Sequence, residues 1–172
     1  MAKKIKKVFE TPWFHIEEEQ LDPKLGPSPF YRFVNPDSVI ILPVTISGEI
    51  IYIKQYRPAL HQFTFEIPAG AIDKGESAIS AAQRELYEET GFKSSDFKII
   101  SRNLLLFSSR AVTKQTILIA KNCIKDKNFI PQESIEVFTI PIQKFEEIIK
   151  KSQFKQAIGI AAFSLAKLRK LL

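Results

Sequence analysis

The sequence contains only one cysteine, Cys123, among its 172 residues. A single thiol cannot form an intramolecular disulfide, nor can it build a thiolate metal site by itself. Long apolar runs are also absent, since the longest, such as residues 38–46, fall far short of the roughly 20 residues that cross a bilayer. The N-terminal lysines are not followed by the apolar stretch of a signal peptide. We therefore expect a soluble protein of the cytoplasm with no membrane partner.

The chain has no internal repeat and no low-complexity run, and 45% of its residues are hydrophobic. This length and composition predict one well-packed domain with a small appendage. The formal net charge is +6, with lysines concentrated near both termini and at 121–127. A basic chain favours a polyanionic partner, either a nucleic acid or a phosphorylated small molecule. The simpler alternative is that these lysines are solvated and keep the protein in solution.

Alternating and β-branched segments outnumber helical ones. We predict strands at 12–18, 29–34, 38–46, 49–56, 63–68, 97–106, 115–121 and 135–140. We predict helices at 77–90, 142–151 and 154–170. The Pro- and Gly-rich joint at 22–29 suggests that the residues before it form a separate layer. We therefore expect an N-terminal β extension over residues 1–34 and a main domain over residues 35–172.

The helix predicted at 77–90 gathers three glutamates, Glu85, Glu88 and Glu89, within a sector of roughly 100°. They can be a merely solvated face, because exposed like charges at this spacing cost only a few tenths of a kcal/mol. However, the small residues Ala78 and Ala81 on the same side leave room beside the carboxylates. Crowded carboxylates raise one another's pKa unless a cation neutralises them, and oxygen ligands select hard ions such as Mg²⁺ or Mn²⁺. The cluster predicts a metal site whose coordination is completed by substrate phosphates.

The loop before this helix has the backbone freedom that a metal site needs. Gly70 and Gly75 permit tight turns that can aim carbonyl groups at a metal, although each can also be an ordinary turn residue. Glu76 and Arg84 carry opposite charges and can pair. Such a pair would tie the loop to the helix.

These residues follow the pattern G-x5-E-x7-R-E-U-x-E-E-x-G-U, where U is apolar. Every fixed position of the pattern matches: Gly70, Glu76, Arg84, Glu85, Leu86, Glu88, Glu89, Gly91 and Phe92. The stretch from Gly70 to Phe92 therefore resembles the Nudix box. With so many spaced positions, this signal is much more specific than a short glycine motif.

Two segments ahead of the box extend the resemblance. QYRPAL at 55–60 and FEIPAG at 65–70 resemble the branch of ADP-ribose and nucleoside-diphosphate-sugar pyrophosphatases. Membership implies an α/β fold, namely the Nudix α/β/α sandwich with a mixed sheet and a small N-terminal β layer. It also implies a homodimer in which that layer reaches toward the site of the partner subunit.

The resemblance assigns roles to the box residues. Glu85 and Glu89 are implied as the principal metal ligands, joined by the carbonyl of Ala69. Glu88 is implied as a further or water-mediated ligand, and Arg84 as the residue that orients the carboxylates. The implied cofactor is Mg²⁺, with Mn²⁺ as the alternative.

The general base of this branch commonly comes from a loop before the last strand. Here that loop lies in PQESIEVF, residues 131–138. Glu133 is the first candidate and Glu136 the second. Glu136 can instead be a solvent-facing strand residue.

The implied substrate contacts lie outside the box. Arg57 resembles the arginine that grips the diphosphate, and Glu66 a polar contact beside it. Trp13 can stack on the nucleobase or serve in plain packing, and Arg32 is a weaker candidate from the N-terminal layer. Relatives usually carry Pro-Gly where this chain has an arginine and an alanine, so Arg110 narrows the pocket near the terminal sugar, holds an extra phosphate, or is an exposed loop residue.

These inferences predict an enzyme that hydrolyses the diphosphate linkage of ADP-ribose or a related nucleoside diphosphate sugar. The products would be a nucleoside monophosphate and a sugar phosphate. The alternatives are a Nudix enzyme for nucleoside triphosphates, dinucleotide polyphosphates or capped RNA, and a catalytically inactive nucleotide-binding module. The expected partner is a small nucleotide sugar, and a nucleic acid is not expected.

Overall fold

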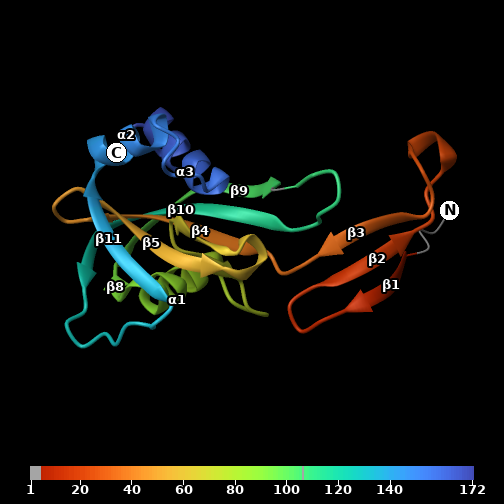
Figure 1. The fold of residues 1–172 in the computed structure, drawn as a ribbon, viewed down its shortest axis with the longest axis horizontal. Helices are drawn as coiled ribbons and strands as arrows, with labels where there is room; N and C mark the ends of the chain where they lie inside the picture. Colours follow the sequence, from red (N-terminus) through yellow and green to blue (C-terminus); the bar gives the residue numbers. More distant parts are fainter. Residues whose placement is uncertain (1–4, 106) are drawn as a thin grey trace.

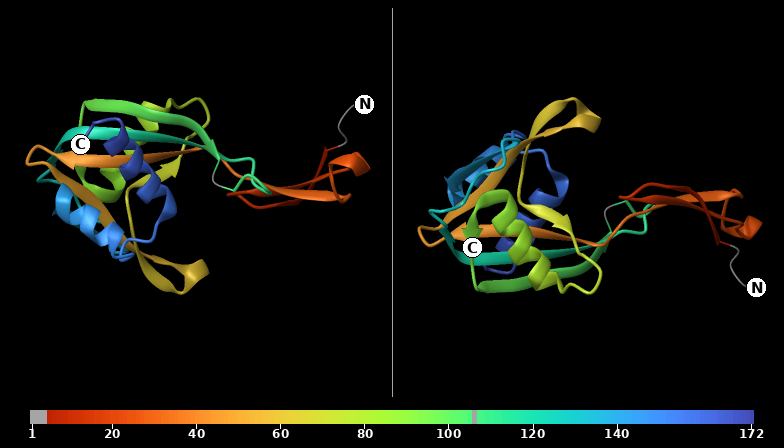
Figure 2. Two further views of the ribbon diagram at one scale, coloured as in Figure 1. Left: turned by 90° about the horizontal axis from the view of Figure 1, so that it is seen from above. Right: turned by 90° about the horizontal axis from the view of Figure 1, so that it is seen from below.

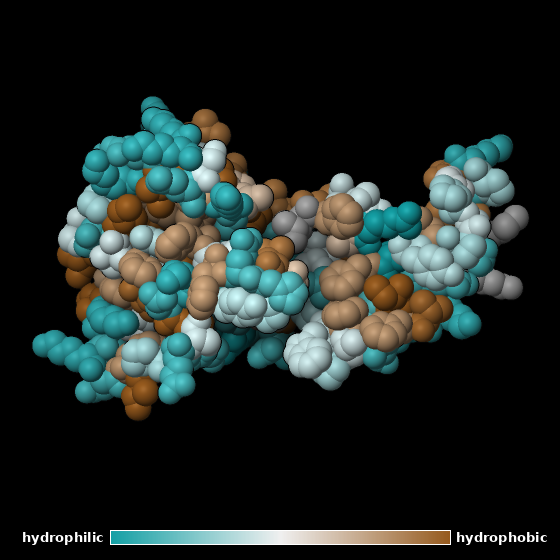
Figure 3. Space-filling view, in the orientation of Figure 1, coloured by the Kyte–Doolittle hydropathy of each residue, from teal (hydrophilic) through white to brown (hydrophobic). Residues whose placement is uncertain are grey.

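The computed structural model describes residues 5–105 and 107–172, which form two β-sheets and three α-helices. The smaller sheet is antiparallel, has the order β1-β2-β3, and consists of β1 (Ile5–Glu10), β2 (His15–Glu19) and β3 (Phe30–Val34). This sheet, which we call the arm, projects from the rest of the molecule (Figures 1 and 2). The arm exposes large apolar side chains, and Figure 3 shows apolar surface gathered on it.

The larger sheet has eight strands and is mixed. Its central order is β11-β5-β4-β10-β8, with β6 beside β5, β7 beside β4, and β9 beside β10. Only β4 and β10 are parallel among the described pairs. The strands are β4 (Ser38–Thr45), β5 (Glu49–Arg57), β6 (Gln62–Glu66), β7 (Ala69–Ala71), β8 (Phe92–Lys93), β9 (Asp96–Leu105), β10 (Lys114–Lys125) and β11 (Ile135–Pro141).

Helices cover both faces of this sheet (Figure 1). They are α1 (Ala78–Thr90), α2 (Ile142–Lys150) and α3 (Ala157–Leu168). Alternate residues of β4 enter different cores, because successive side chains of a strand point to opposite faces. Ile41 lies in one core with Leu86 of α1, whereas Ile40 and Leu42 lie in the other with Phe163 of α3. The α/β/α sandwich with a mixed sheet and a small N-terminal β-sheet is therefore confirmed.

Most predicted elements correspond to observed ones, with differences near the N-terminus. The sequence does not predict β1, whose residues are all exposed and lack a buried alternate face. β2 begins later than predicted because Thr11 and Phe14 close a turn, with Thr11 N donating to Phe14 O at 2.9 Å. The segment 22–29 connects β2 with β3, so it lies inside the arm, where η1 (Pro23–Leu25) forms one 3₁₀ turn. The domain division at residue 34 stays a prediction.

The other differences concern element ends and the two short strands β7 and β8, which the sequence does not predict. Helix α3 begins at Ala157, after an irregular approach that carries the buried Phe154. A second 3₁₀ turn, η2 (Pro58–Leu60), joins β5 to β6. The last residue of the strand predicted at 97–106 lies outside the described residues. Within residues 5–105 and 107–172, no helix has the length and apolar content needed to cross a membrane.

Candidate active site

Helix α1 positions the glutamate cluster. Ser77 caps its start by accepting a hydrogen bond from Ser80 N at 3.1 Å. Gly91 ends it in the left-handed region, at a φ of 68°, and donates its N–H to the Tyr87 carbonyl. The buried residues of the helix are Ala81, Ala82, Leu86 and Thr90. The three glutamates therefore project from the adjoining face.

The glutamates differ in their surroundings. Glu85 lies over the β7 backbone, where a Cβ on Gly70 would be 2.0 Å from the Glu85 carboxyl carbon. Glu89 Oε2 accepts a hydrogen bond from Ala69 N at 3.1 Å. Glu88 is more open, with 49% of its side chain exposed. The lack of a side chain at Gly70 thus permits α1 to bring a carboxylate onto the strand that carries Ala69.

Arg84 ties the loop to the helix as its sequence position suggests. Its Nε and Nη2 donate to the Glu76 carboxylate at 3.1 and 2.9 Å, and Nη2 also donates to the Ala71 carbonyl at 2.9 Å. Nη1 donates to Glu85 Oε1 at 2.6 Å and to Glu88 Oε2 at 3.4 Å. The hydrogen bonds with Glu76 raise the pKa of Arg84 well above its ordinary value. Arg84 therefore stays charged and holds two of the clustered carboxylates in place.

The carboxylates of this cluster are crowded and only partly neutralised. Burial raises the pKa of Glu89 to about 8; the hydrogen bond from Ala69 opposes this shift and the charge of Glu85 adds to it. Burial also raises the pKa of Glu85, in spite of the hydrogen bond from Arg84. The three carboxylates of α1 outnumber the one guanidinium group, that of Arg84, which contacts them. Each carboxylate offers only oxygen atoms to a cation. In charge and donor type, the residues fit a hard divalent cation.

The ligand set is not already assembled. Within residues 5–105 and 107–172, no group of three His, Cys, Asp or Glu side chains is arranged to hold a metal ion. Both half-buried glutamates already have hydrogen-bond partners, since Arg84 engages Glu85 and Ala69 N engages Glu89. A cation that binds here competes with Arg84 for the Glu85 carboxylate.

Arg57 and Glu66 form an ion pair beside this cluster. Arg57 Nε donates to Glu66 Oε1 at 2.7 Å, and Nη2 donates to Oε2 at 2.5 Å. These bonds raise the pKa of Arg57, and the charge of Glu89 contributes, which indicates that the pair lies near the α1 carboxylates. Arg57 Nη1 has no hydrogen-bond partner among the described residues. The guanidinium of Arg57 is thus held by Glu66 on one side and has a free N–H group, at Nη1, on the other.

Glu66 has two further partners, Thr64 and Gln156, neither of which is predicted from the sequence. Thr64 Oγ1 donates to Glu66 Oε1 at 2.5 Å, and Gln156 Nε2 donates to Oε2 at 3.0 Å. Burial acts to raise the pKa of Glu66, but the hydrogen bonds from Arg57 and Thr64 lower it overall. Gln156 comes from the start of α3, and no local motif marks it. Only the packing of α3 against the sheet reveals its position.

The two candidate bases occupy different positions. Glu133 is exposed in the turn before β11. The neighbouring Gln132 donates from Nε2 to the Glu88 carbonyl at 3.4 Å, which places this turn against α1. Glu136 lies on β11 opposite Lys54 of β5 and accepts a hydrogen bond from Lys54 Nζ at 2.7 Å. The environment of Glu136 is that of a strand residue in a cross-strand ion pair.

The N-terminal candidates lie on the arm. Trp13 is in the β1–β2 turn with 75% of its surface exposed, and it lines a pocket together with Phe14 and Val34. Arg32 donates from Nε to Glu17 at 2.7 Å and from Nη1 to Glu19 at 2.8 Å. Both partners belong to β2, so Arg32 cross-links the arm within this chain.

Arg110 also contacts the arm. Its Nη1 donates to the Tyr31 carbonyl at 3.1 Å, and its guanidinium carbon lies 4.4 Å from the centre of the Phe30 ring. The Arg110 carbonyl accepts a hydrogen bond from Phe33 N at 2.8 Å, and Val112 N donates to the Phe33 carbonyl at 3.0 Å. The loop around Arg110, where relatives usually carry Pro-Gly, thus binds β3.

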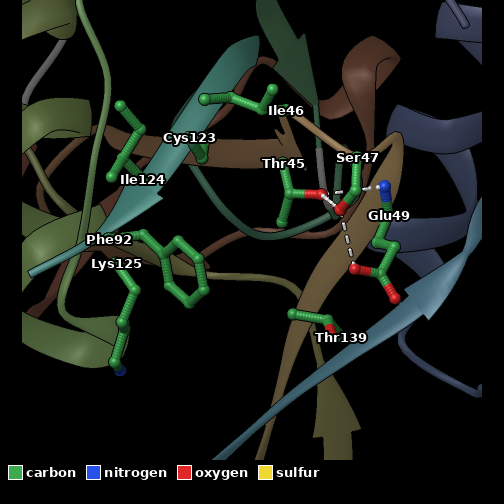
Figure 4. A pocket seen from close by; sticks show the side chains of 9 residues that line it. All are labelled: Thr45, Ile46, Ser47, Glu49, Phe92, Cys123, Ile124, Lys125 and Thr139. Atoms are coloured by element: carbon green, nitrogen blue, oxygen red, sulfur yellow. Dashed lines mark hydrogen bonds between the residues drawn. The ribbon is translucent and has the colours of Figure 1, made fainter.

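The pocket in Figure 4 lies at the C-terminal end of β4, whereas β7 pairs with the other end of that strand. Its lining residues, none of them a predicted site residue, are Thr45, Ile46, Ser47, Glu49, Phe92, Cys123, Ile124, Lys125 and Thr139. Ser47 lies 2.9 Å from both the Thr45 hydroxyl and the Glu49 carboxylate, so these polar groups pair with one another. Burial raises the pKa of Cys123 to about 12, which makes its thiol a poor nucleophile.

Known proteins resemble this chain in sequence. The sequence profile of the NUDIX domain matches residues 34–161. An uncharacterized Nudix hydrolase of Schizosaccharomyces pombe is 32% identical over 146 residues, which make up 76% of this chain and 70% of that protein. The ADP-ribose pyrophosphatase of Saccharomyces cerevisiae is 35% identical over 115 residues, or 61% of this chain and 48% of that protein. The match therefore spans about half the length of the second relative.

A solved structure shares the fold. The crystal structure of an ADP compounds hydrolase aligns with a TM-score of 0.73 at 21% sequence identity, over 96% of this chain and 91% of that chain. The alignment includes most of the arm as well as the sandwich, because so much of both chains is covered. The box at 70–92, the sandwich and the NUDIX match agree. This chain belongs to the Nudix hydrolase family.

Proposed function

We propose that this chain hydrolyses the diphosphate linkage of ADP-ribose or a related nucleoside diphosphate sugar, in a metal-dependent reaction that gives a nucleoside monophosphate and a sugar phosphate. Its main support is the complete set of glutamates on α1 next to an arginine with a free N–H group. The similarity to the yeast ADP-ribose pyrophosphatase supports the substrate class. We place the enzyme in the cytoplasm, which suits a chain with one buried, unpaired cysteine.

The α1 carboxylates are the proposed metal ligands. Glu85, Glu89 and the Ala69 carbonyl would hold a divalent cation, with Glu88 as a further or water-mediated ligand. We propose Mg²⁺, with Mn²⁺ as the alternative, because every donor is an oxygen atom. When bound, such a cation neutralises phosphate charge and makes a water molecule nucleophilic. Arg84 keeps Glu85 and Glu88 oriented through its hydrogen bonds.

Arg57 is the proposed diphosphate contact. Its Nε and Nη2 bind Glu66, so the free Nη1 can donate to a phosphate oxygen without rearrangement of the guanidinium. Glu66 accepts hydrogen bonds from three side chains, which leaves this carboxylate little capacity for the substrate. We therefore assign Glu66 to fixing Arg57, in place of the direct polar contact that the resemblance implies.

Glu133 is the proposed general base. Its turn lies against α1 through the bond from Gln132 to the Glu88 carbonyl, and Glu133 is exposed there. A base must come within hydrogen-bond reach of the water that it activates, and an exposed residue in a turn can move into that reach. Glu136 is a weaker candidate, since its carboxylate already pairs with Lys54.

We propose that the arm forms the homodimer contact and that it stacks on the nucleobase of the substrate. Trp13 and other apolar side chains of the arm are exposed, and such surfaces mark interaction sites. The arm projects away from the sandwich (Figure 2), so a second copy is better placed to receive it. Trp13 would then stack on the base in the partner's site, while Arg32 and Arg110 hold the arm in shape. Sedimentation should show a dimer at micromolar concentration, and a monomer would refute this part.

A substrate panel tests the proposed reaction. Purified protein is incubated with Mg²⁺, Mn²⁺ or EDTA and with ADP-ribose, other nucleotide sugars, dinucleotide polyphosphates, triphosphates and capped RNA, and the products are identified by mass. We expect a nucleoside monophosphate and a sugar phosphate, only with metal. Cleavage restricted to triphosphates, dinucleotides or capped RNA would overturn the substrate class. Nucleotide binding without any cleavage would identify an inactive binding module.

A further inference from the structure

The side chain of Gln156 connects the start of α3 to the last residue of β6, Glu66, and to Ile67 after it. Gln156 stands at the N-cap position of α3, yet its side chain makes no capping hydrogen bond. Instead, its Oε1 accepts a hydrogen bond from Ile67 N at 3.0 Å, and its Nε2 donates to Glu66 Oε2 at 3.0 Å. Both ends of one amide are therefore engaged by consecutive residues that precede Ala69.

The surrounding structure fixes this amide. Phe154, two residues earlier, is 1% exposed and packs edge to face on Phe145 of α2, with ring centres 4.9 Å apart. On the helical side, a Cβ on Gly159 would be 2.6 Å from Gln156 Oε1. The missing side chain of Gly159 thus leaves the space that the amide occupies. The buried ring of Phe154 and the missing side chain of Gly159 together place the Gln156 amide against Glu66 and Ile67.

Gln156 is linked to Arg57 through the carboxylate of Glu66. Glu66 Oε2 accepts from both Arg57 Nη2 and Gln156 Nε2, so Gln156 limits where that oxygen can lie. Without Gln156, the carboxylate would keep its bonds to Arg57 and Thr64 but could turn away from its present plane, and the guanidinium would turn with it. We propose that Gln156 is a positioning residue that aims Arg57 at the diphosphate of the substrate. This inference rests on the role of Arg57 in the proposed function.

Two substitutions test the contact in different ways. Gln156→Glu keeps an oxygen acceptor for Ile67 N, but it removes the donor to Glu66 and adds a negative charge beside that carboxylate. Gln156→Ala removes both bonds. Gln153→Ala is the matched control, because Gln153 is an exposed glutamine in the same connection and its side chain has no hydrogen-bond partner among the described residues. Circular dichroism and thermal melts establish that each variant is folded.

The readout is the dissociation constant for ADP, measured calorimetrically in EDTA so that neither metal binding nor hydrolysis contributes. We expect Gln156→Glu and Gln156→Ala to weaken ADP binding about tenfold or more, since hydrogen bonds to charged groups contribute on this scale. Gln153→Ala should stay within about twofold of the parent. When Arg57→Ala is already present, adding the neutral Gln156→Ala should have less than about a twofold effect, because Gln156 acts on binding only through Arg57.

Two outcomes would overturn the proposal. Parental ADP affinity in both Gln156 variants would show that the amide does not position Arg57. An equal loss with and without Arg57→Ala would show that Gln156 acts on binding by another route. The measurement uses ADP and no turnover, so a substrate panel that rejects ADP-ribose hydrolysis leaves this test standing. Conversely, hydrolysis of ADP-ribose combined with independent effects of the two residues would reject only the positioning role.

Discussion

Addition of Mg²⁺ to the metal-free protein at pH 7 should release close to one proton from Glu89. Burial raises the pKa of this carboxyl to about 8. At pH 7 about nine molecules in ten therefore carry the proton, which must leave before the carboxylate binds a cation. The ionised fraction rises from about 1% at pH 6 to about one half at pH 8, so the apparent Mg²⁺ affinity should rise about fiftyfold over that range.

The same pKa sets the sign of a stability effect. The folded state keeps the Glu89 proton between the ordinary pKa of 4.5 and the raised value of about 8, whereas the unfolded chain loses it near 4.5. The stabilisation from this proton is complete below pH 4.5 and is lost as the pH rises through about 8. Bound Mg²⁺ should restore stability at high pH, because it replaces the proton on the carboxylate.

Calorimetry in two buffers with different ionisation enthalpies measures both the affinity and the released protons. Glu89→Gln is the control, because glutamine cannot release the proton that titrates at about 8 in the parent. The variant should bind Mg²⁺ weakly and with little pH dependence. A parent protein whose Mg²⁺ affinity is constant from about pH 6 to pH 8, with no proton released, would refute the assignment of Glu89 as a metal ligand.

Further substitutions test other parts of the site and fold. Gly70→Ala should lower turnover at least about tenfold with little change in melting temperature, because its Cβ would displace the flexible Glu85 carboxylate from a position 2.0 Å away. Glu133→Gln should lower kcat about a hundredfold at similar KM, whereas Glu136→Gln should leave kcat near the parent value; the reverse pattern would move the base to β11. Gly91→Ala should reduce the free energy of unfolding by about 1–3 kcal/mol, because a φ of 68° strains a residue with a Cβ. A thermal melt within about one degree of the parent would contradict that last expectation.

The carboxylate cluster was accessible from the sequence because its determinants are local. Glu85 and Glu89 share a helical face through their spacing alone, and Arg84 and Glu76 lie close enough along the chain for their pairing to be anticipated. The continuous run of apolar residues in β4 is likewise typical of a strand buried on both faces. Such features follow from backbone geometry within one element or one loop.

The contacts made across the fold were not accessible in this way. Gln156 and Glu66 are 90 residues apart in sequence, and Arg110 and Tyr31 are 79 apart. Their pairing depends on where α3 and the loop before β10 pack, which no local periodicity specifies. Strand β1 escaped prediction for a related reason: its pairing with β2 leaves all its residues exposed, so no buried face marks it. Long-range packing therefore brings Gln156 to Glu66 and Arg110 to the arm.

Single-turnover hydrolysis of ADP-ribose by the parent, Glu85→Gln and Glu89→Gln proteins is the most direct measurement of the role of the α1 carboxylates. With Mg²⁺, the parent should give AMP and ribose 5-phosphate, and EDTA should abolish the reaction reversibly. Each variant should fold, as judged by circular dichroism, and react at least about a hundredfold more slowly. Full activity in a verified metal-free sample, or parental rates in both folded variants, would contradict metal-dependent hydrolysis at these glutamates.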